Sequence, residues 1–368
     1  MASPPVLEIE SLLQPVSEAA PAGADLRADQ APDSPYYKIK DARTSARAAE
    51  CNEVGDQTGI VAPEWRTVID LAPPLLGTHT KDLEIAAWLA EAMLRAEGFA
   101  GLRDAFTLAA GLIDTFWDGL YPLPDEDGVS TRVAPLTGLN GEGGEGTLIL
   151  PLRKAVLLHG SERPLAFWHI DKAIELAKLT DQAKKDRLVK EGSATMDEIQ
   201  AALASTPPAA VLTVVEDVKG CHEAFLALEK SLTAKCGNDA PPTSNIRSTL
   251  ALIVDTITYV AKDRLAMAQQ SAAAAEPGAG ETAAPTADGA PARGGQSGGY
   301  TREAAFDEML RIAAFFRRTE PHSPLSYTLE ELVRRGRLPM PELLAELIPD
   351  AGARNQFFLV AGIKPPAS

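Results

Sequence analysis

The chain has 368 residues and a mass of 39.0 kDa, a length that favours two or three domains over a single small module. Hydrophobic residues make up 45% and charged residues 23%, which provides enough apolar surface for packed cores and excludes a wholly disordered chain. Lys and Arg number 35 against 51 for Asp and Glu, so the net charge of −16 disfavours nucleic acid and anionic membrane surfaces as partners.

Targeting and cysteine patterns favour a cytoplasmic location. No window reaches 18 apolar residues, and the start of the chain lacks the basic and apolar regions of a secretory signal peptide. Cys51, Cys221 and Cys236 include no C-x-x-C pair, so they predict neither a disulfide framework nor a zinc cage. We therefore expect a cytoplasmic protein without direct membrane insertion.

The first predicted domain, residues 1–140, centres on a helical hairpin over residues 79–120. Thr80 is a possible cap for its first helix, and Asp82 is interpreted as a charge in the first helical turn. The second helix follows Gly98 and repeats large apolar side chains at helical spacing. Apolar residues cover most of both helices, so we expect them to be buried and to pack together.

The second predicted domain, residues 141–270, begins in a Gly- and Glu-rich stretch near residues 137–147 that interrupts every periodic pattern. Its best strand candidate is residues 147–158, which we interpret as two short extended pieces around Pro151. The rest of this domain is predicted to be helical, with helices over Phe167–Leu179, after the capping box Thr195-x-x-Glu198, over Ala209–Thr233 and over Ser244–Ala268.

A tether and a small module follow. Residues 271–299 contain 20 Ala, Gly or Pro among 29 residues, a composition that predicts a flexible linker. Residues 300–368 form the predicted C-terminal oligomerisation module, whose last apolar run, residues 357–363, is a strand or a buried turn. Three helices are expected in this module: one ending by Thr319, one from Pro324 closed by Gly336, and one over Pro341–Ile348.

Convergent catalytic or metal-binding patterns are absent from the sequence. The five histidines lack the paired spacing of a metal site, and Cys221 belongs to an apolar helical stripe, which predicts an inert buried thiol. The run Gly141-x-Gly143-x-x-Gly146 matches the dinucleotide fingerprint, but it lacks the preceding strand and the following helix. We interpret this run as a connecting loop and predict no cofactor, no metal and no catalytic residue.

Several arginines of the C-terminal module stand out in an otherwise acidic chain. They complement the dipoles of helix C-termini, or they contact an acidic partner or a neighbouring subunit, and the sequence leaves both readings open. The candidate interface residues are Arg317, Arg318, His322, Arg334, Arg335 and Arg337.

Both ends of the chain carry motifs that resemble the TssA family of bacterial type VI secretion components. The N-terminal motifs, typical of its ImpA-type N-terminal domain, are Pro21-x-Gly23-x-Asp25-Leu26-Arg27, Tyr36-Tyr37, Arg43, Ala46-Arg47, Lys81-Asp82-Leu83-Glu84, Trp88-Leu89 and Phe116-Trp117-Asp118-x-Leu120-Tyr121-Pro122. A C-terminal ending found in the same family resembles Phe315-Phe316-Arg317-Arg318-Thr319-Glu320-Pro321-His322-Ser323-Pro324 and Glu346-Leu347-Ile348-Pro349-Asp350.

The resemblance implies a mainly helical, non-enzymatic cytoplasmic assembly factor. It further implies a ring-like homo-oligomer that contacts baseplate, sheath, tube and membrane-complex proteins of the secretion machine. Trp88, Trp117 and Tyr121 are interpreted as core aromatics of the N-terminal domain rather than as contact residues. Two other readings remain open: a generic helical adaptor with a tethered interaction module, and a hydrolase whose site assembles from dispersed acids and histidines.

Overall fold

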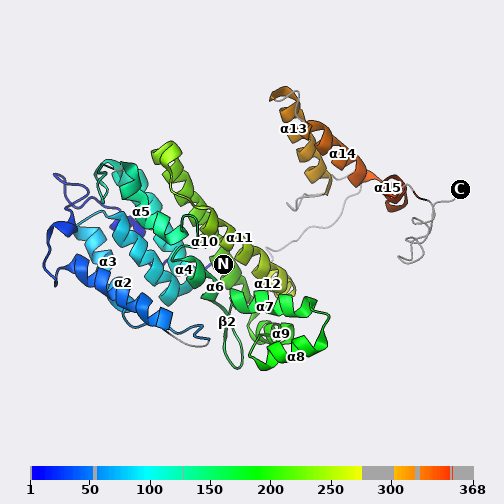
Figure 1. Ribbon diagram of the computed structural model, residues 1–368, viewed down its shortest axis with the longest axis horizontal. Helices are drawn as coiled ribbons and strands as arrows, with labels where there is room; N and C mark the ends of the chain where they lie inside the picture. The colour runs from blue at the N-terminus through cyan, green and yellow to red at the C-terminus, as the bar shows by residue number, and fades with distance from the viewer. Residues whose placement is uncertain are drawn as a thin grey trace, which may run out of the picture. The chain divides into compact units, whose positions relative to one another are not determined.

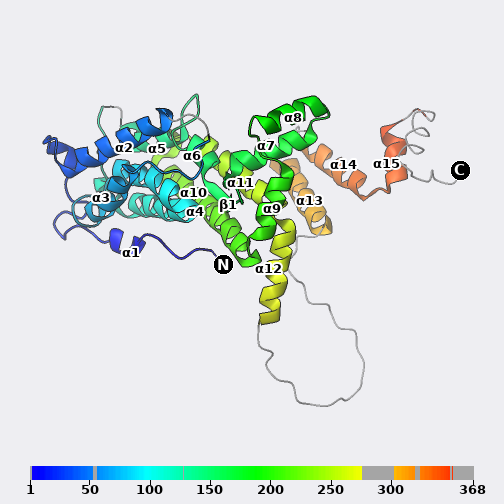
Figure 2. The ribbon, with the colours of Figure 1, turned by 90° about the horizontal axis from the view of Figure 1, so that it is seen from below.

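The structure, a computed structural model, consists of two compact units, Met1–Ala279 and Gly280–Ser368. In their described ranges both are mainly helical, and the strands there form one small two-stranded hairpin, which confirms the mainly α fold class (Figures 1 and 2). The described residues are 2–52, 56–126, 128–275, 302–319, 324–348 and 350.

The first unit contains twelve helices in its described ranges, with the strand pair between α6 and α7. Short 3-10 turns lie at Leu26–Ala28 (η1), Trp117–Gly119 (η2) and Gly237–Asp239 (η3). The other elements are α1 (Ile9–Leu12), α2 (Pro35–Asn52), α3 (Trp65–Thr78), α4 (Leu83–Phe116), α5 (Val129–Asn140), α6 (Ile149–Lys154), β1 (Val156–His159), β2 (Pro164–Ala166), α7 (Phe167–Lys178), α8 (Gln182–Lys190), α9 (Met196–Ser205), α10 (Pro208–Cys236), α11 (Ser244–Val260) and α12 (Lys262–Ala275).

The predicted hairpin over residues 79–120 is α4, whose helical conformation breaks at Gly98 with φ 61° and ψ −145°. A straight helix of 34 residues would hold its ends about 50 Å apart. Here the Leu83 amide donates to the Tyr121 carbonyl at 2.7 Å, and the Tyr121 amide donates to the Lys81 carbonyl at 2.9 Å. The two halves of α4 therefore fold back on each other, because only glycine adopts this turn without strain.

The core of the first unit runs without interruption across the expected boundary at residue 140. α10 packs along α4 more extensively than any other pair of elements, with the Phe106 and Phe225 ring centroids 5.0 Å apart (Figure 1). Because α4 is apolar on nearly all sides, it needs cover from α10 as well as from α3. Residues 1–140 and 141–270 thus share one core, and independent folding of residues 1–140 stays a prediction.

The strand expected over residues 147–158 is wrong in its first part, which forms α6. Pro151 lies in the first turn of that helix, where no intrahelical amide donor is required, so it does not interrupt the helix. The second part forms β1, which pairs antiparallel with β2. The helix predicted over Ser244–Ala268 ends at Val260 and resumes as α12, while the predicted helices corresponding to α7, α9 and α10 are present.

The second unit contains α13 (Arg302–Thr319), α14 (Leu325–Arg337) and α15 (Met340–Leu347). α13 packs on α14, and the ring of Phe306 lies so close to Gly336 that a Cβ there would approach it to 2.7 Å. Gly336 therefore permits helix contact rather than closing its helix. Of the predicted tether, residues 271–275 belong to α12, consistent with the high helix propensity of alanine; the remainder, residues 357–363 and His322 lie outside the described residues.

Candidate functional site

A groove lies between α2, α4 and α5, with a volume of about 480 Å³. α4 contributes Glu84 and, one helical turn later, Ala87 and Trp88. α5 contributes Ala134 and Gly138 on its facing side. Small side chains on both helices leave the space between them unfilled. This volume falls within the range of common ligand sites, and most of the groove lining is apolar.

Asp82 binds Arg27, which lines one end of the groove. The sequence indicated a first-turn charge, but the residue is the N-cap of α4 and is fully buried. Its Oδ1 accepts from the amides of Glu84 at 2.8 Å and Ile85 at 3.2 Å. The Arg27 guanidinium also donates to both carboxylate oxygens, at 2.7 and 3.1 Å. Burial raises the pKa of the Asp82 carboxyl, and these four hydrogen bonds oppose that shift.

Arg27 and Tyr36 share the carboxylate of Glu84 at the same end. Glu84 Oε2 accepts from Arg27 Nη2 at 2.7 Å and from the Tyr36 hydroxyl at 2.8 Å. Burial alone lowers the pKa of Arg27, but its bonds to Asp82 and Glu84 outweigh this effect and raise it. Burial, reinforced by Glu84, raises the pKa of the Tyr36 hydroxyl. The tyrosine therefore acts as a hydrogen-bond donor that fixes the wall of the groove.

The other end of the groove is cationic. Arg43 on α2 donates through Nε to Oε2 of Glu91, a fully buried residue of α4. Arg47, one turn further along α2, reaches the other oxygen of Glu91 at 3.9 Å. The Arg43 guanidinium also lies 5.8 Å from the centre of the Trp88 ring. Two arginines thus share one carboxylate at this end.

The predicted core aromatics occupy different environments. Trp88 is 4% exposed, packs on Tyr36 with ring centroids 5.4 Å apart, and forms part of the groove wall. Trp117 and Tyr121 are half-buried, and Arg132 stacks on the Trp117 ring at 4.9 Å. Several motif residues, among them Arg27, Tyr36 and Trp88, line the groove, whereas Trp117 and Tyr121 do not. Arg27, Tyr36 and Arg43 belong to the sequence motifs, but no pattern in the sequence indicates that they line one groove.

The C-terminal arginines pair with carboxylates of their own unit. Arg317 contacts Glu330 at 2.6 Å, and Arg337 contacts Glu303 at 2.9 Å. Arg334 and Arg335 both bind Glu346, at 2.6 and 2.9 Å, and also Glu331. These pairs are exposed and contribute little stability individually. Arg318 is exposed.

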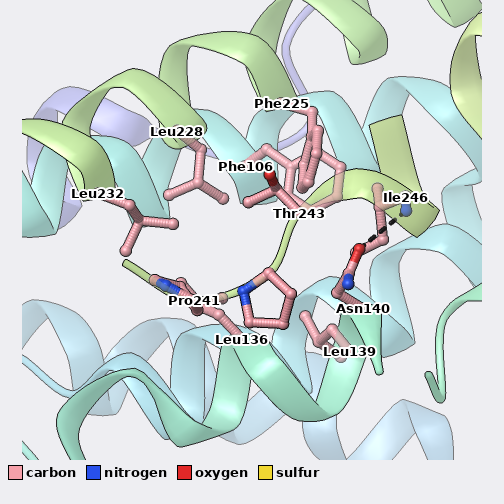
Figure 3. Close-up of a pocket in the computed structure, with 11 residues that line it drawn as sticks. Phe106, Leu136, Leu139, Asn140, Phe225, Leu228, Leu232, Pro241, Thr243 and Ile246 are labelled. Carbon is pink, nitrogen blue, oxygen red and sulfur yellow. Dashed lines mark hydrogen bonds between the residues drawn. The ribbon is translucent and has the colours of Figure 1, made fainter. Parts of the chain in front are cut away.

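A second hollow lies in the core between α4, α5 and α10, closed by the segment before α11 (Figure 3). At its rim, Asn140 accepts a hydrogen bond from the Ile246 amide at 3.0 Å. The other lining groups are mostly apolar. Its volume of about 10 Å³ is too small for any ligand larger than water. This hollow is a packing gap and not a site.

Cys221 and His169, two residue types often used in catalysis, are buried within the fold. Cys221 is fully buried, and burial raises the pKa of its thiol, as expected for an inert cysteine. His169 is buried as well, accepting the Ala166 amide through Nδ1 at 3.0 Å and lying 2.8 Å from Asp56 through Nε2. Within the described ranges, no group of three or more potential ligands could hold a metal ion, and no helix is long and apolar enough to cross a membrane.

Comparison with known proteins gives consistent matches. The family profile "ImpA, N-terminal, type VI secretion system" matches residues 13–141. The type VI secretion system component TssA1 of Pseudomonas aeruginosa is 27% identical over 354 residues, spanning 94% of this chain and 96% of the relative. A solved structure of the N-terminal domain of the TssA component from Burkholderia cenocepacia, including its conserved ImpA_N region, superposes with a TM-score of 0.57. That structure is 26% identical and covers 70% of this chain and 95% of its own.

The groove and its charged network thus lie inside a helical domain of the ImpA N-terminal type. The family resemblance indicated by the sequence motifs is confirmed at both levels, in sequence along nearly the whole chain and in structure over the larger part of it. Along nearly its whole length the chain is similar to TssA components of type VI secretion systems.

Proposed function

We propose that this chain is a non-enzymatic scaffold of a type VI secretion machine that works in the cytoplasm and coordinates baseplate and sheath–tube assembly. Its first unit contacts other components of the machine, and its second unit joins copies of the chain into a ring-like homo-oligomer. The observation that carries this proposal is the apolar surface that α13 and α14 leave exposed.

The second unit leaves large apolar side chains exposed in its described ranges. Five of them, on α13 and α14, are each at least 41% exposed, whereas few of the described side chains of this unit are buried. A unit of this size without disulfides gains stability by association. Exposed apolar patches of this kind mark protein interfaces. The exposed residues are Ile312, Phe315, Leu325, Tyr327 and Leu332.

The charge distribution favours the same assignment. Residues 301–368 contain nine basic and nine acidic residues, so the net charge of −16 belongs to the rest of the chain. Copies can approach through a neutral unit with less repulsion than through the acidic one. The ion pairs of Arg317, Arg334 and Arg335 within one chain keep this surface compensated.

Light scattering of the full chain tests the scaffold proposal. We expect a closed multimer for the wild type and a much smaller species for Leu332→Glu, because a charge would enter the apolar surface. Leu252→Glu is the matched control: Leu252 is 52% exposed on α11 and Leu332 is 51% exposed on α14. A wild-type monomer, or a Leu332→Glu/Phe315→Glu double variant of unchanged mass, would contradict assembly through this unit and favour a simple adaptor.

A further inference from the structure

We propose that the groove between α2, α4 and α5 binds an acidic segment of a partner protein, with Arg43 receiving a carboxylate of that segment. The inference rests on the proposed function only in requiring a protein partner. It names the chemistry that the partner must present and the residues that recognise it, and it is independent of how copies of the chain assemble.

The shape of the groove suits a peptide rather than a compact ligand. It is open along the facing sides of two helices, and its α5 wall contains Ala134 and Gly138, both exposed. A Cβ added at Gly138 would meet no atom within 4 Å, so space for partner side chains extends to the helix backbone. Trp88 and Pro135 give this space apolar walls. Apolar side chains of a bound segment would be buried here, which provides the main gain in free energy on binding.

Backbone groups of α5 add a polar contact inside the groove. Pro135 lies within the helix and has no N–H, so the carbonyl of Thr131, four residues earlier, loses its usual helical donor. Both residues line the groove. The Thr131 carbonyl therefore retains capacity to accept an N–H, a group that every peptide segment supplies.

Charge complementarity identifies an acidic segment. Lys40, Arg43 and Arg47 are spaced i, i+3 and i+7 on α2, so they form one basic stripe in a chain with a net charge of −16. Glu91 is the carboxylate that α4 places against this stripe. Arg43 and Arg47 are two cations against this one buried anion, which leaves positive charge available for a ligand.

Arg43 is the best-positioned of these cations. Its Nε is occupied by Glu91 and its plane is supported by Trp88, so the guanidinium is already oriented. Among the residues that the structure describes, none accepts a hydrogen bond from its two terminal amino groups. A guanidinium held in this way forms forked hydrogen bonds with a carboxylate at little further entropic cost.

The opposite end of the groove gives the segment a direction. Glu84 and Asp82 bring two carboxylates there against the single cation Arg27. An acidic side chain is repelled at that end and attracted at the Arg43 end. We therefore expect the bound segment to have one acidic residue, which lies at the Arg43 end. Small or apolar residues on one side of it then extend toward the Glu84 end.

Selection of phage-displayed random dodecapeptides on the immobilised full chain tests this proposal. Enriched peptides are expected to share one Asp or Glu beside apolar residues. Their affinities are then measured by fluorescence anisotropy for the wild type and for Gly138→Leu, which fills the groove. Gly144→Leu is the matched control, since a Cβ there also meets nothing within 4 Å and Gly144 does not line the groove.

We expect Gly138→Leu to weaken binding about tenfold or more and Gly144→Leu to leave it unchanged. Arg43→Gln should lower the affinity for the acidic peptide by about tenfold. It should leave the affinity for an analogue with Ala at the acidic position unchanged. Absence of enrichment, peptides without a shared acidic position, or equal affinity for Gly138→Leu would overturn the proposal. Arg43→Gln leaves Glu91 buried without its closest partner, so the folding of this variant is verified by tryptophan fluorescence. If the Arg43→Gln variant unfolds, the result for Gly138→Leu decides the outcome.

The scaffold proposal and this inference fail in different measurements. A Gly138→Leu chain that retains the wild-type mass in light scattering but loses the peptide supports the groove without bearing on assembly. A monomeric wild type that still selects acidic peptides would overturn the oligomeric scaffold and leave the groove assignment intact.

Discussion

Replacement of Asp82 by alanine should strongly destabilise the first unit. The carboxylate is fully buried and accepts four hydrogen bonds, two from amides that begin α4 and two from Arg27. Loss of an N-cap costs about 1 kcal/mol. Removal of one partner of a buried ion pair costs about 3–5 kcal/mol, because the remaining charge stays poorly solvated. The Arg27 side chain is 23% exposed, so water relieves part of this penalty.

The two contributions overlap, and we expect Asp82→Ala to lower the free energy of unfolding by about 3–5 kcal/mol in total. Asp82→Asn separates them, since the amide oxygen still caps α4 but carries no charge. It should recover about 1 kcal/mol relative to alanine. Arg27→Met in the Asp82→Ala background should cost much less than Arg27→Met alone, because the two side chains act as a pair.

Urea unfolding followed by tryptophan fluorescence measures these differences at neutral pH. All four tryptophans of the chain, Trp65, Trp88, Trp117 and Trp168, lie in the first unit, so the signal excludes the second unit. A loss below about 1 kcal/mol for Asp82→Ala would show that the network at this end of the groove does not hold the fold. Equal losses for alanine and asparagine would refute the capping role.

Three further results are expected. Trp88→Ala should cost about 3–5 kcal/mol in the same unfolding assay, because Trp88 is 4% exposed; a cost below about 1 kcal/mol would indicate a contact residue instead. Burial, opposed by Asp56, lowers the pKa of His169 below its usual 6.5, so the unfolded chain binds a proton first as pH falls. Stability should therefore drop below about pH 6.5 by up to about 1.4 kcal/mol per pH unit, and His169→Gln should remove this dependence. Limited proteolysis should cut residues 276–299 first, and early cleavage within α4 would contradict the tether.

Helices with a regular apolar pattern could be predicted from the sequence, and α3 shows where such prediction ends. α10 follows one buried stripe from Val211 to Phe225, which periodicity detects. α3 contains Pro73 and Pro74 in its interior, a pair that normally indicates a helix boundary. Its buried face against α4 overrides this local preference, and only the packed structure reveals that contact.

The groove could not be predicted because its parts come from three separate segments. The sequence shows Arg27, Glu84 and Gly138 as ordinary surface-type residues of different elements. Their meeting depends on the turn of α4 at Gly98 and on the docking of α2 and α5 against the first half of α4. The one available signal is spacing: basic residues at i, i+3 and i+7 on α2 oppose acids at helical spacing on α4.

The ratio of arginines to carboxylates differs among the three buried carboxylates of the α4 hairpin, Asp82, Asp104 and Glu91. At Asp82, one arginine serves several carboxylates. At Asp104, Arg103 likewise serves two, the second being Asp217 at 3.6 Å. At Glu91 the ratio is reversed, because two arginines meet one carboxylate.

Carboxylates therefore outnumber arginines around Asp82 and Asp104, whereas arginines outnumber carboxylates at Glu91 beside the groove. A pair that serves folding alone gains nothing from a second, partly exposed guanidinium, since burying unpaired charge is costly. The excess of positive charge at Glu91 is accounted for if a partner protein supplies a further carboxylate. Arg47→Gln, which removes the surplus but keeps the Arg43 pair, should accordingly change stability by no more than about 0.5 kcal/mol while weakening acidic peptides in the anisotropy assay.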